Sequence, residues 1–190
     1  MKKIQRSEIL PLAEYEQVRE HFRRRVIELK KPRRVALGDE MSIVFENYDT
    51  MLMQVQEMLR TERITNEKGI AHELDTYNEL VPADGALSAT LFIEIPDARR
   101  REEMLTRLCA IEEHVVLEVG AARARATFEE GRRDKGRAAA VQYLQFPLPP
   151  DALAALRAKQ PAALVFDHPA LQARFELSPG TVASLADDVG

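Results

Sequence analysis

The sequence predicts a protein of the α+β class, with a helical N-terminal part packed on a mainly antiparallel sheet and additional helices near the C-terminus. Between residues 12 and 81, apolar side chains recur three or four positions apart, which is the spacing of one helix face. After Pro82, short runs rich in β-branched and aromatic residues take over. Because short turns separate these runs, we expect antiparallel strands. We predict a single domain over residues 1–190, made of a helical part (1–82) and a sheet-rich part (83–190).

Three helices are expected in the first part. Each follows from an apolar stripe, and two of them stop before a proline, Pro32 or Pro82, which disfavours helix in the residue before it. Asn66 suits the N-cap of the third helix, because its side chain can accept a backbone N–H bond. Between the first two helices, Gly38 and Asp39 favour the turn of a short hairpin. The expected bounds are 12–31, 47–64 and 66–81 for the helices, and 33–37 with 41–45 for the hairpin.

Strands dominate the second part. A strand at 87–95 is followed by a helix over 97–111, for which Asp97 is the expected N-cap. A further strand follows at 115–119, so this strand–helix–strand passage allows one crossover connection. A charged segment with two glycines, 129–137, is expected to be a hairpin loop. The remaining expected elements are strands at 122–128, 138–146, 163–166 and 171–177, a helix from about 150 to 159, and a closing helix over 178–187.

Composition favours a cytoplasmic protein without a membrane partner. There is no run of about 18 uncharged apolar residues, and the N-terminus reaches Glu8 without the apolar stretch of a signal peptide. Cys109 is the only cysteine, which excludes an intrachain disulfide and a thiolate metal cluster. Its neighbours Leu108 and Ile111 predict that Cys109 is buried on the inner side of a helix.

Several familiar catalytic motifs are absent. The chain has no Gly-rich phosphate loop, no Gly-x-Ser-x-Gly nucleophile elbow and no His-Glu-x-x-His zinc motif, so the common nucleotide, hydrolase and zinc-protease functions lose support. The net charge is −4. Although the first 34 residues are basic, glutamates interrupt the run and no aromatic stacking platform accompanies the arginines. Nucleic-acid binding is therefore disfavoured.

Polar side chains concentrate in the second and third expected helices. Glu57 and Arg60 lie three positions apart and can pair along a helix, so a solvated face accounts for them without any function. A pocket for an anion, an amide or a metal is the alternative, and it requires at least two of these side chains to be buried. The candidate ligand-binding residues are Asn47, Asp49, Glu57, Arg60, Glu73, Asn78 and, from the second part, His168.

Histidines suggest two further sites. His72 and Asp75 lie three apart on one helix face, which makes them the candidate metal ligands, although two ligands do not complete a site. Asp167 and His168 follow an expected strand, where an aspartate beside a histidine suits acid–base chemistry. Because adjacent strand residues point to opposite faces, a turn with an Asx-type hydrogen bond is the favoured interpretation.

Longer blocks of sequence add a family resemblance. They are Phe45-Glu46-Asn47-Tyr48-Asp49-Thr50, residues 54–60, His72-Glu73-Leu74-Asp75-Thr76-Tyr77-Asn78, residues 140–146, and Phe166-Asp167-His168-Pro169. In this order, over almost the whole chain, they resemble the bacterial domain-of-unknown-function family numbered 3501. The resemblance implies no established activity, but it implies gene neighbours that encode a rubrerythrin and an iron–sulfur oxidoreductase resembling heterodisulfide reductase subunits. The family pattern has histidine where Gln142 stands, so a role for that imidazole as ligand or base does not apply to this chain.

Two functions remain open. The first is a redox-linked accessory or adaptor protein, which uses its helical first part to bind an iron–sulfur or rubrerythrin-like partner. The alternative is a small enzyme or ligand-binding protein with a polar pocket that can also hold a metal. The sequence specifies no cofactor and does not decide whether the protein is an enzyme. Self-association as a two-fold homodimer is a further expectation.

Overall fold

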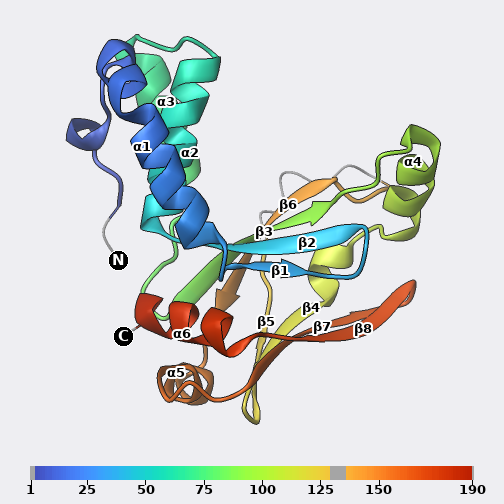
Figure 1. Ribbon diagram of the computed structural model, residues 1–190. Coiled ribbons are helices and arrows are strands. Elements are labelled where there is room, and N and C mark those ends of the chain that lie inside the picture. Colours follow the sequence, from blue (N-terminus) through green and yellow to red (C-terminus); the bar gives the residue numbers. More distant parts are fainter. Residues whose placement is uncertain (1–2, 129–135, 190) are drawn as a thin grey trace.

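The computed structural model describes residues 3–128 and 136–189 and confirms the α+β class (Figure 1). Within these residues, the chain forms six α-helices and two four-stranded antiparallel sheets. The strands are therefore divided between two sheets, where the sequence suggested one. The expected charged loop falls mainly on residues 129–135, which lie outside the described part of the chain.

Each sheet joins strands from distant parts of the chain. Sheet A has the order β1 (Arg34–Ala36), β2 (Met41–Glu46), β3 (Ala86–Ile93), β6 (Val141–Pro147), and sheet B has the order β5 (Ala122–Arg125), β4 (Val115–Val119), β7 (Ala162–His168), β8 (Leu171–Glu176). Every pair of neighbouring strands is antiparallel. Because β3 and β4 belong to different sheets, the passage between them changes sheets and is not the crossover that the sequence allowed.

The main hydrophobic core lies between the two sheets. Alternate residues of each strand point inward, so Phe45 and Leu91 of sheet A belong to the same buried cluster as Leu117 and Phe166 of sheet B. Each such side chain contributes about 1.5–3 kcal/mol when it is fully buried. Helices α5 (Pro150–Arg157) and α6 (Pro179–Asp188) extend this cluster at one end of the sandwich (Figure 1).

The first three helices form a separate body, which we call the helical lobe. It consists of α1 (Leu12–Lys30), α2 (Tyr48–Thr61) and α3 (Glu67–Asn78), preceded by the 3-10 turn η1 (Arg6–Glu8). Its buried residues, which include Val55, Leu59 and Leu74, make a second hydrophobic cluster distinct from the main core. The hairpin of β1 and β2 lies between α1 and α2 in the chain yet pairs with β3, so the lobe is tied to sheet A at several points.

Local signals set the helix starts as expected. The side chains of Asn66, Asp97 and Ser178 accept backbone N–H bonds at the starts of α3, α4 (Ala98–Arg107) and α6. Each such cap contributes about 1 kcal/mol, because it satisfies a donor that the helix itself leaves free. The N-cap residues predicted for α3 and α4 are therefore confirmed.

The prediction for Cys109 is wrong. We expected it on the inner side of a helix that continues to Ile111, but α4 ends at Arg107 and Cys109 is exposed in the following turn. Ala110 adopts a left-handed conformation with φ of 64°, which redirects the chain into the 3-10 turn η2 (Ile111–His114). Leu108 and Ile111 take the buried positions on either side of this turn.

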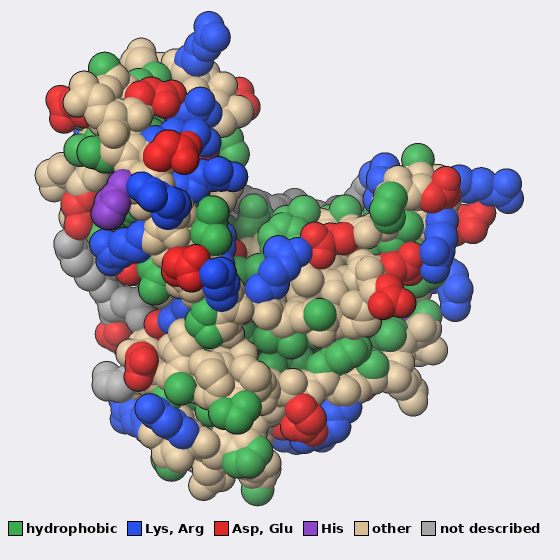
Figure 2. Space-filling model, in the orientation of Figure 1, with side chains coloured by type: hydrophobic (Ala, Val, Ile, Leu, Met, Phe, Trp, Pro, Cys, Tyr) green, Lys and Arg blue, Asp and Glu red, His purple; other side chains and the backbone are tan. Residues whose placement is uncertain are grey.

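Sheet A carries a hollow on its outer face, the face turned away from sheet B. The helical lobe rises at one end of this face and α4 at the other (Figure 1), and the surface is hollowed between them (Figure 2). We call this hollow the recess. On its floor, Val141 lies opposite Phe92 and Tyr143 lies opposite Thr90 in the strand register, so their side chains share the outer face.

Candidate functional site

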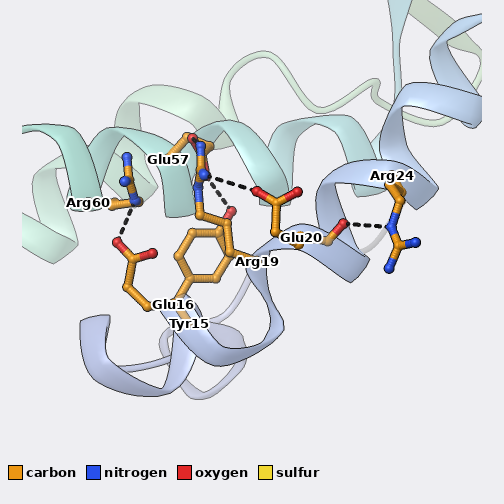
Figure 3. Close-up of polar contacts among 7 residues, drawn as sticks. All are labelled: Tyr15, Glu16, Arg19, Glu20, Arg24, Glu57 and Arg60. Carbon is orange, nitrogen blue, oxygen red and sulfur yellow. Dashed lines mark hydrogen bonds and ion pairs between the residues drawn. The ribbon is translucent and has the colours of Figure 1, made fainter.

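The predicted polar cluster on α2 is an ion-pair network between two helices (Figure 3). Both oxygens of Glu57 accept bonds from Arg19 on α1, at 2.7 Å from Nε and 2.9 Å from Nη2. The hydroxyl of Tyr15 donates to Glu57 Oε1 at 2.7 Å. One turn further along α2, Arg60 Nε donates to Glu16 Oε1 at 2.6 Å. Glu57 and Arg60 therefore join α2 to α1.

The electrostatics of this network keep Glu57 ionised. Hydrogen bonding to Arg19 lowers the pKa of Glu57, an effect that exceeds the opposing effect of burial. Burial raises the pKa of Tyr15, and its hydrogen bond to the Glu57 carboxylate raises it further. Glu57 is thus a half-buried carboxylate whose two oxygens are occupied by protein donors, which suits a structural role.

The other predicted binding residues lie apart from this network. Asn47 caps α2, and Asn78 exchanges two bonds with the backbone of Ile4 and so anchors the N-terminal segment. Asp49 approaches Arg25 at 3.4 Å, while Glu73 is half-buried on α3. With His168 on sheet B, the seven candidates do not meet in one pocket.

Metal-ligating groups are also scattered. His72 and Asp75 are both exposed on α3. Within residues 3–128 and 136–189, no group of three or more His, Cys, Asp or Glu side chains could hold a metal ion. The described part of the chain therefore offers no third ligand of these types to this pair.

One carboxylate near these helices is buried. Glu46, the last residue of β2, has a side chain that is only 5% exposed. Its Oε1 accepts a bond from Thr90 at 2.9 Å, and Lys30 Nζ lies 3.6 Å from Oε2. The charge is thus compensated from α1 and β3, at the junction of the helical lobe and sheet A. The pocket hypothesis required at least two of the polar side chains around α2 and α3 to be buried. Apart from Glu46, the named binding candidates on these two helices are half-buried or exposed.

A different imidazole accompanies Asp167. Its carboxylate lies 2.9 Å from Nδ1 of His114, at the end of η2, and accepts a bond of 2.9 Å from Arg125 on β5. Hydrogen bonds from Arg125 and then His114 lower the pKa of Asp167. The sequence suggested only the adjacent His168 as a partner of Asp167. His114 was missed because 53 positions separate it from Asp167 and no local motif marks the pair.

His168 points to the other face of β7 and is buried, as strand alternation requires. Its Nδ1 accepts the backbone N–H of Ala170, so Nε2 carries the proton and donates to the carbonyl of Cys109 at 3.0 Å. These two hydrogen bonds fix the orientation of the ring, which ties the turn after α4 to the turn between β7 and β8. The rings of His168 and His114 meet edge to face, with centroids 4.9 Å apart.

The contacts of His114 leave one ring atom available. With Nδ1 held by Asp167, Nε2 has no hydrogen-bond partner within residues 3–128 and 136–189. The side chain is 31% exposed, so a small molecule can reach it. A carboxylate behind an imidazole fixes the orientation of the ring, which suits proton transfer or metal ligation at the other nitrogen.

An apolar pocket lies at the same end of the molecule, between the β1–β2 turn, α4 and the start of β8. Its volume is about 320 Å³. Glu40 and Arg100 form an ion pair of 2.8 Å among its lining residues. Leu108 and Leu171 also line it, so the bond from His168 to Cys109 stiffens one wall. The full lining is Leu37, Asp39, Glu40, Met41, Ile93, Ile95, Arg100, Met104, Leu108 and Leu171.

Gln142, where the family resemblance leads us to expect histidine, lies on the core side of β6. Its side chain is buried, and Nε2 donates to the carbonyl of Ala139 at 3.1 Å. Oε1 has no hydrogen-bond partner among the described residues. The position therefore holds a neutral amide against the core, without a group that can act as a base.

The fold and these sites define a two-sheet α+β protein with an attached helical lobe, an apolar pocket and an oriented surface histidine. The chain belongs to the family described as "Protein of unknown function (DUF3501)", whose model matches residues 3–189. It is also similar to a solved structure of a novel protein of unknown function from Burkholderia pseudomallei K96243. That similarity has 36% identity, a TM-score of 0.93 and coverage of 100% of both chains. No curated protein matches the chain.

Among the described residues, no helix is long and apolar enough to cross a membrane.

Proposed function

We propose that this protein is a cytosolic accessory protein that docks onto a redox partner of the iron–sulfur oxidoreductase or rubrerythrin-like class. The observation that supports a docking role is the recess between the helical lobe and α4 (Figure 2). Its floor carries Val141, which is 45% exposed, together with the half-buried rings of Phe92 and Tyr143. Apolar side chains in a concave surface with charged walls are typical of protein interfaces.

The recess floor is a better-supported surface than the outer side of α1. Val18 and Ile27 on α1 are exposed to a similar degree, 43% and 44%. They lie nine positions apart, which puts them on opposite sides of a helix with 3.6 residues per turn. They cannot form one patch. The partner that we propose therefore contacts the recess floor, and the helical lobe serves as one of its walls.

Co-purification tests this proposal. We expect the tagged protein, isolated from its native host, to bring down an iron–sulfur or rubrerythrin-like protein and to contain no stoichiometric metal or flavin after the partner is removed. Val141→Asp places a charge on the recess floor and should reduce the recovered partner at least about tenfold, since apolar interface contacts do not tolerate an unpaired charge.

Gln172→Asp is the matched control, because it adds the same charge on an exposed residue of β8, in the other sheet. It should leave the partner's recovery unchanged. Equal recovery with both variants would contradict docking in the recess. Stoichiometric metal or flavin in the isolated chain would contradict the accessory role itself. Light scattering on the same samples checks the expected two-fold homodimer.

A second candidate is a small enzyme or ligand-binding protein, and the free Nε2 of His114 favours it. If this imidazole acts as a base, the protein should hydrolyse an activated ester such as p-nitrophenyl acetate faster than buffer does. His114→Gln should remove most of that rate, whereas His21→Gln, at an exposed position on α1, should retain it. Equal rates for the two variants would exclude a special role for His114.

A further inference from the structure

The apolar pocket has the size and the lining of a small-ligand site. Its volume of about 320 Å³ is at the small end of the range of about 300–1,000 Å³ found for ligand pockets. Seven of its ten lining residues are aliphatic or Met. The thioethers of Met41 and Met104 can adjust to the shape of a guest, because methionine side chains are unbranched and flexible.

The charged residues of this pocket are arranged with opposite signs on opposite sides. Asp39 and Glu40 come from the β1–β2 turn, and Arg100 comes from α4. The acidic side and the basic side therefore face each other next to an apolar interior.

These charged groups retain unused hydrogen-bonding capacity. The ion pair joins Arg100 Nη1 to Glu40 Oε1 and leaves Glu40 Oε2 and the other guanidinium nitrogens without a side-chain partner in the described part of the chain. Asp39 also has no partner there. Because the Arg100 side chain is 63% exposed, the pair contributes little to stability and can rearrange at little cost.

We propose that this pocket binds a free apolar α-amino acid as its zwitterion. The ammonium group lies against Asp39 and Glu40, the carboxylate binds Arg100, and the side chain enters between Met41 and Met104. An amine or a fatty acid of the same length satisfies only one of the two sides. This site goes beyond the docking role proposed above and does not depend on it.

Methionine-methyl NMR on the full-length protein tests the proposal. L-leucine should shift the methyl signals of Met41 and Met104 and leave those of Met51, Met53 and Met58, which lie on α2, unchanged. 3-Methylbutylamine lacks the carboxylate of leucine and 4-methylpentanoate lacks its ammonium. Each should bind roughly 10- to 150-fold more weakly, because a lost charged hydrogen bond costs about 1.5–3 kcal/mol. Each methylene removed from an unbranched side chain should cost about fourfold in affinity, from about 0.8 kcal/mol per CH₂.

Two variants and one control variant locate the binding. Glu40→Gln should reduce the preference for leucine over 4-methylpentanoate, because only Asp39 is left to face the ammonium group, while Glu103→Gln, on the outer side of α4 and paired with Arg99, should preserve it. Met104→Trp should fill the pocket and remove the leucine-dependent shift of Met41. Unshifted Met41 and Met104 signals up to the solubility limit of leucine would overturn the proposal. So would an analogue with a single charge that binds as tightly as leucine, which would reduce the site to one for amines or acids.

Discussion

A buried ion pair between Arg33 and Asp188 holds α6 against the residue that precedes β1. Their side chains are 4% and 10% exposed, and two bonds of 2.7 Å join them. Arg33 also donates to the carbonyl of Ser184, so a residue just before β1 holds the last turn of α6. Removal of one partner from such a pair leaves an uncompensated buried charge, which is far more costly than loss of an exposed pair.

Asp188→Asn should therefore lower the free energy of unfolding by about 3 kcal/mol, because the guanidinium of Arg33 stays buried without its counter-charge. For a chain of this size, this corresponds to a fall in Tm of about 6–12 °C. Asp187→Asn is the matched control, since Asp187 is the exposed neighbour on the same turn, and its effect should stay within about 0.5 kcal/mol. Thermal unfolding by circular dichroism measures both. Identical midpoints for the two variants would show that the pair does not stabilise the fold.

Contacts between residues also explain why the sites were harder to predict than the elements. The caps of α3 and α4 were predictable because Asn66 and Asp97 act within three residues of themselves. The pair of His114 and Asp167 was not, since it depends on how η2 meets β7 in space. Cys109 was wrongly predicted to be buried because the left-handed residue after it is Ala110, whereas a glycine at this position would have indicated a turn.

At the scale of elements, the spacing of apolar residues and the turn residues predicted most helices and strands, but they did not predict which strands share a sheet. The apolar faces of β3 and β4 each indicate burial, yet burial alone does not specify whether two strands share a sheet or face each other across a core. The pocket is a product of this partition, because it forms where the β1–β2 turn of sheet A meets the start of β8 in sheet B.

The network between α1 and α2 gives a pH-dependent prediction for these two elements. Arg19 lowers the pKa of Glu57 below its ordinary value of 4.5, so the folded protein takes up this proton at lower pH than the unfolded chain does. The stabilisation is complete above pH 4.5 and is lost as the pH falls through the folded pKa. Glu57→Gln should lower the free energy of unfolding by about 1–2 kcal/mol at about pH 7 and by much less at about pH 3.

Urea unfolding at the two pH values checks this difference. Glu62→Gln, at the exposed C-terminal end of the same helix, provides the control and should behave like the unaltered protein at both. A cost for Glu57→Gln that does not change with pH would mean that the Glu57 charge is unimportant and that only its hydrogen bonds join the helices.

At the scale of the whole molecule, the two hydrophobic clusters raise the question of how far the chain unfolds as one unit. The cluster of the helical lobe and the main core share no buried residue. The lobe is nevertheless joined to sheet A by the contact of Lys30 with Glu46 and by the bond from Ser88 to the carbonyl of Leu80. Few links across a boundary between two cores permit one part to open while the other remains folded.

Leu59→Ala should distinguish unfolding of the whole chain as one unit from separate opening of the helical lobe. Leu59 is fully buried in the lobe, and its truncation should cost about 2–5 kcal/mol. We expect hydrogen exchange to accelerate mainly in α2 and α3, with the amides of β3, β4 and β7 keeping most of their protection. Leu117→Ala, an equally buried change in the main core, should instead accelerate exchange in both sheets. If Leu59→Ala instead loses protection uniformly across the lobe and both sheets, the links at Glu46 and Ser88 make the molecule one cooperative unit. A partner bound in the recess could then not act on the lobe alone.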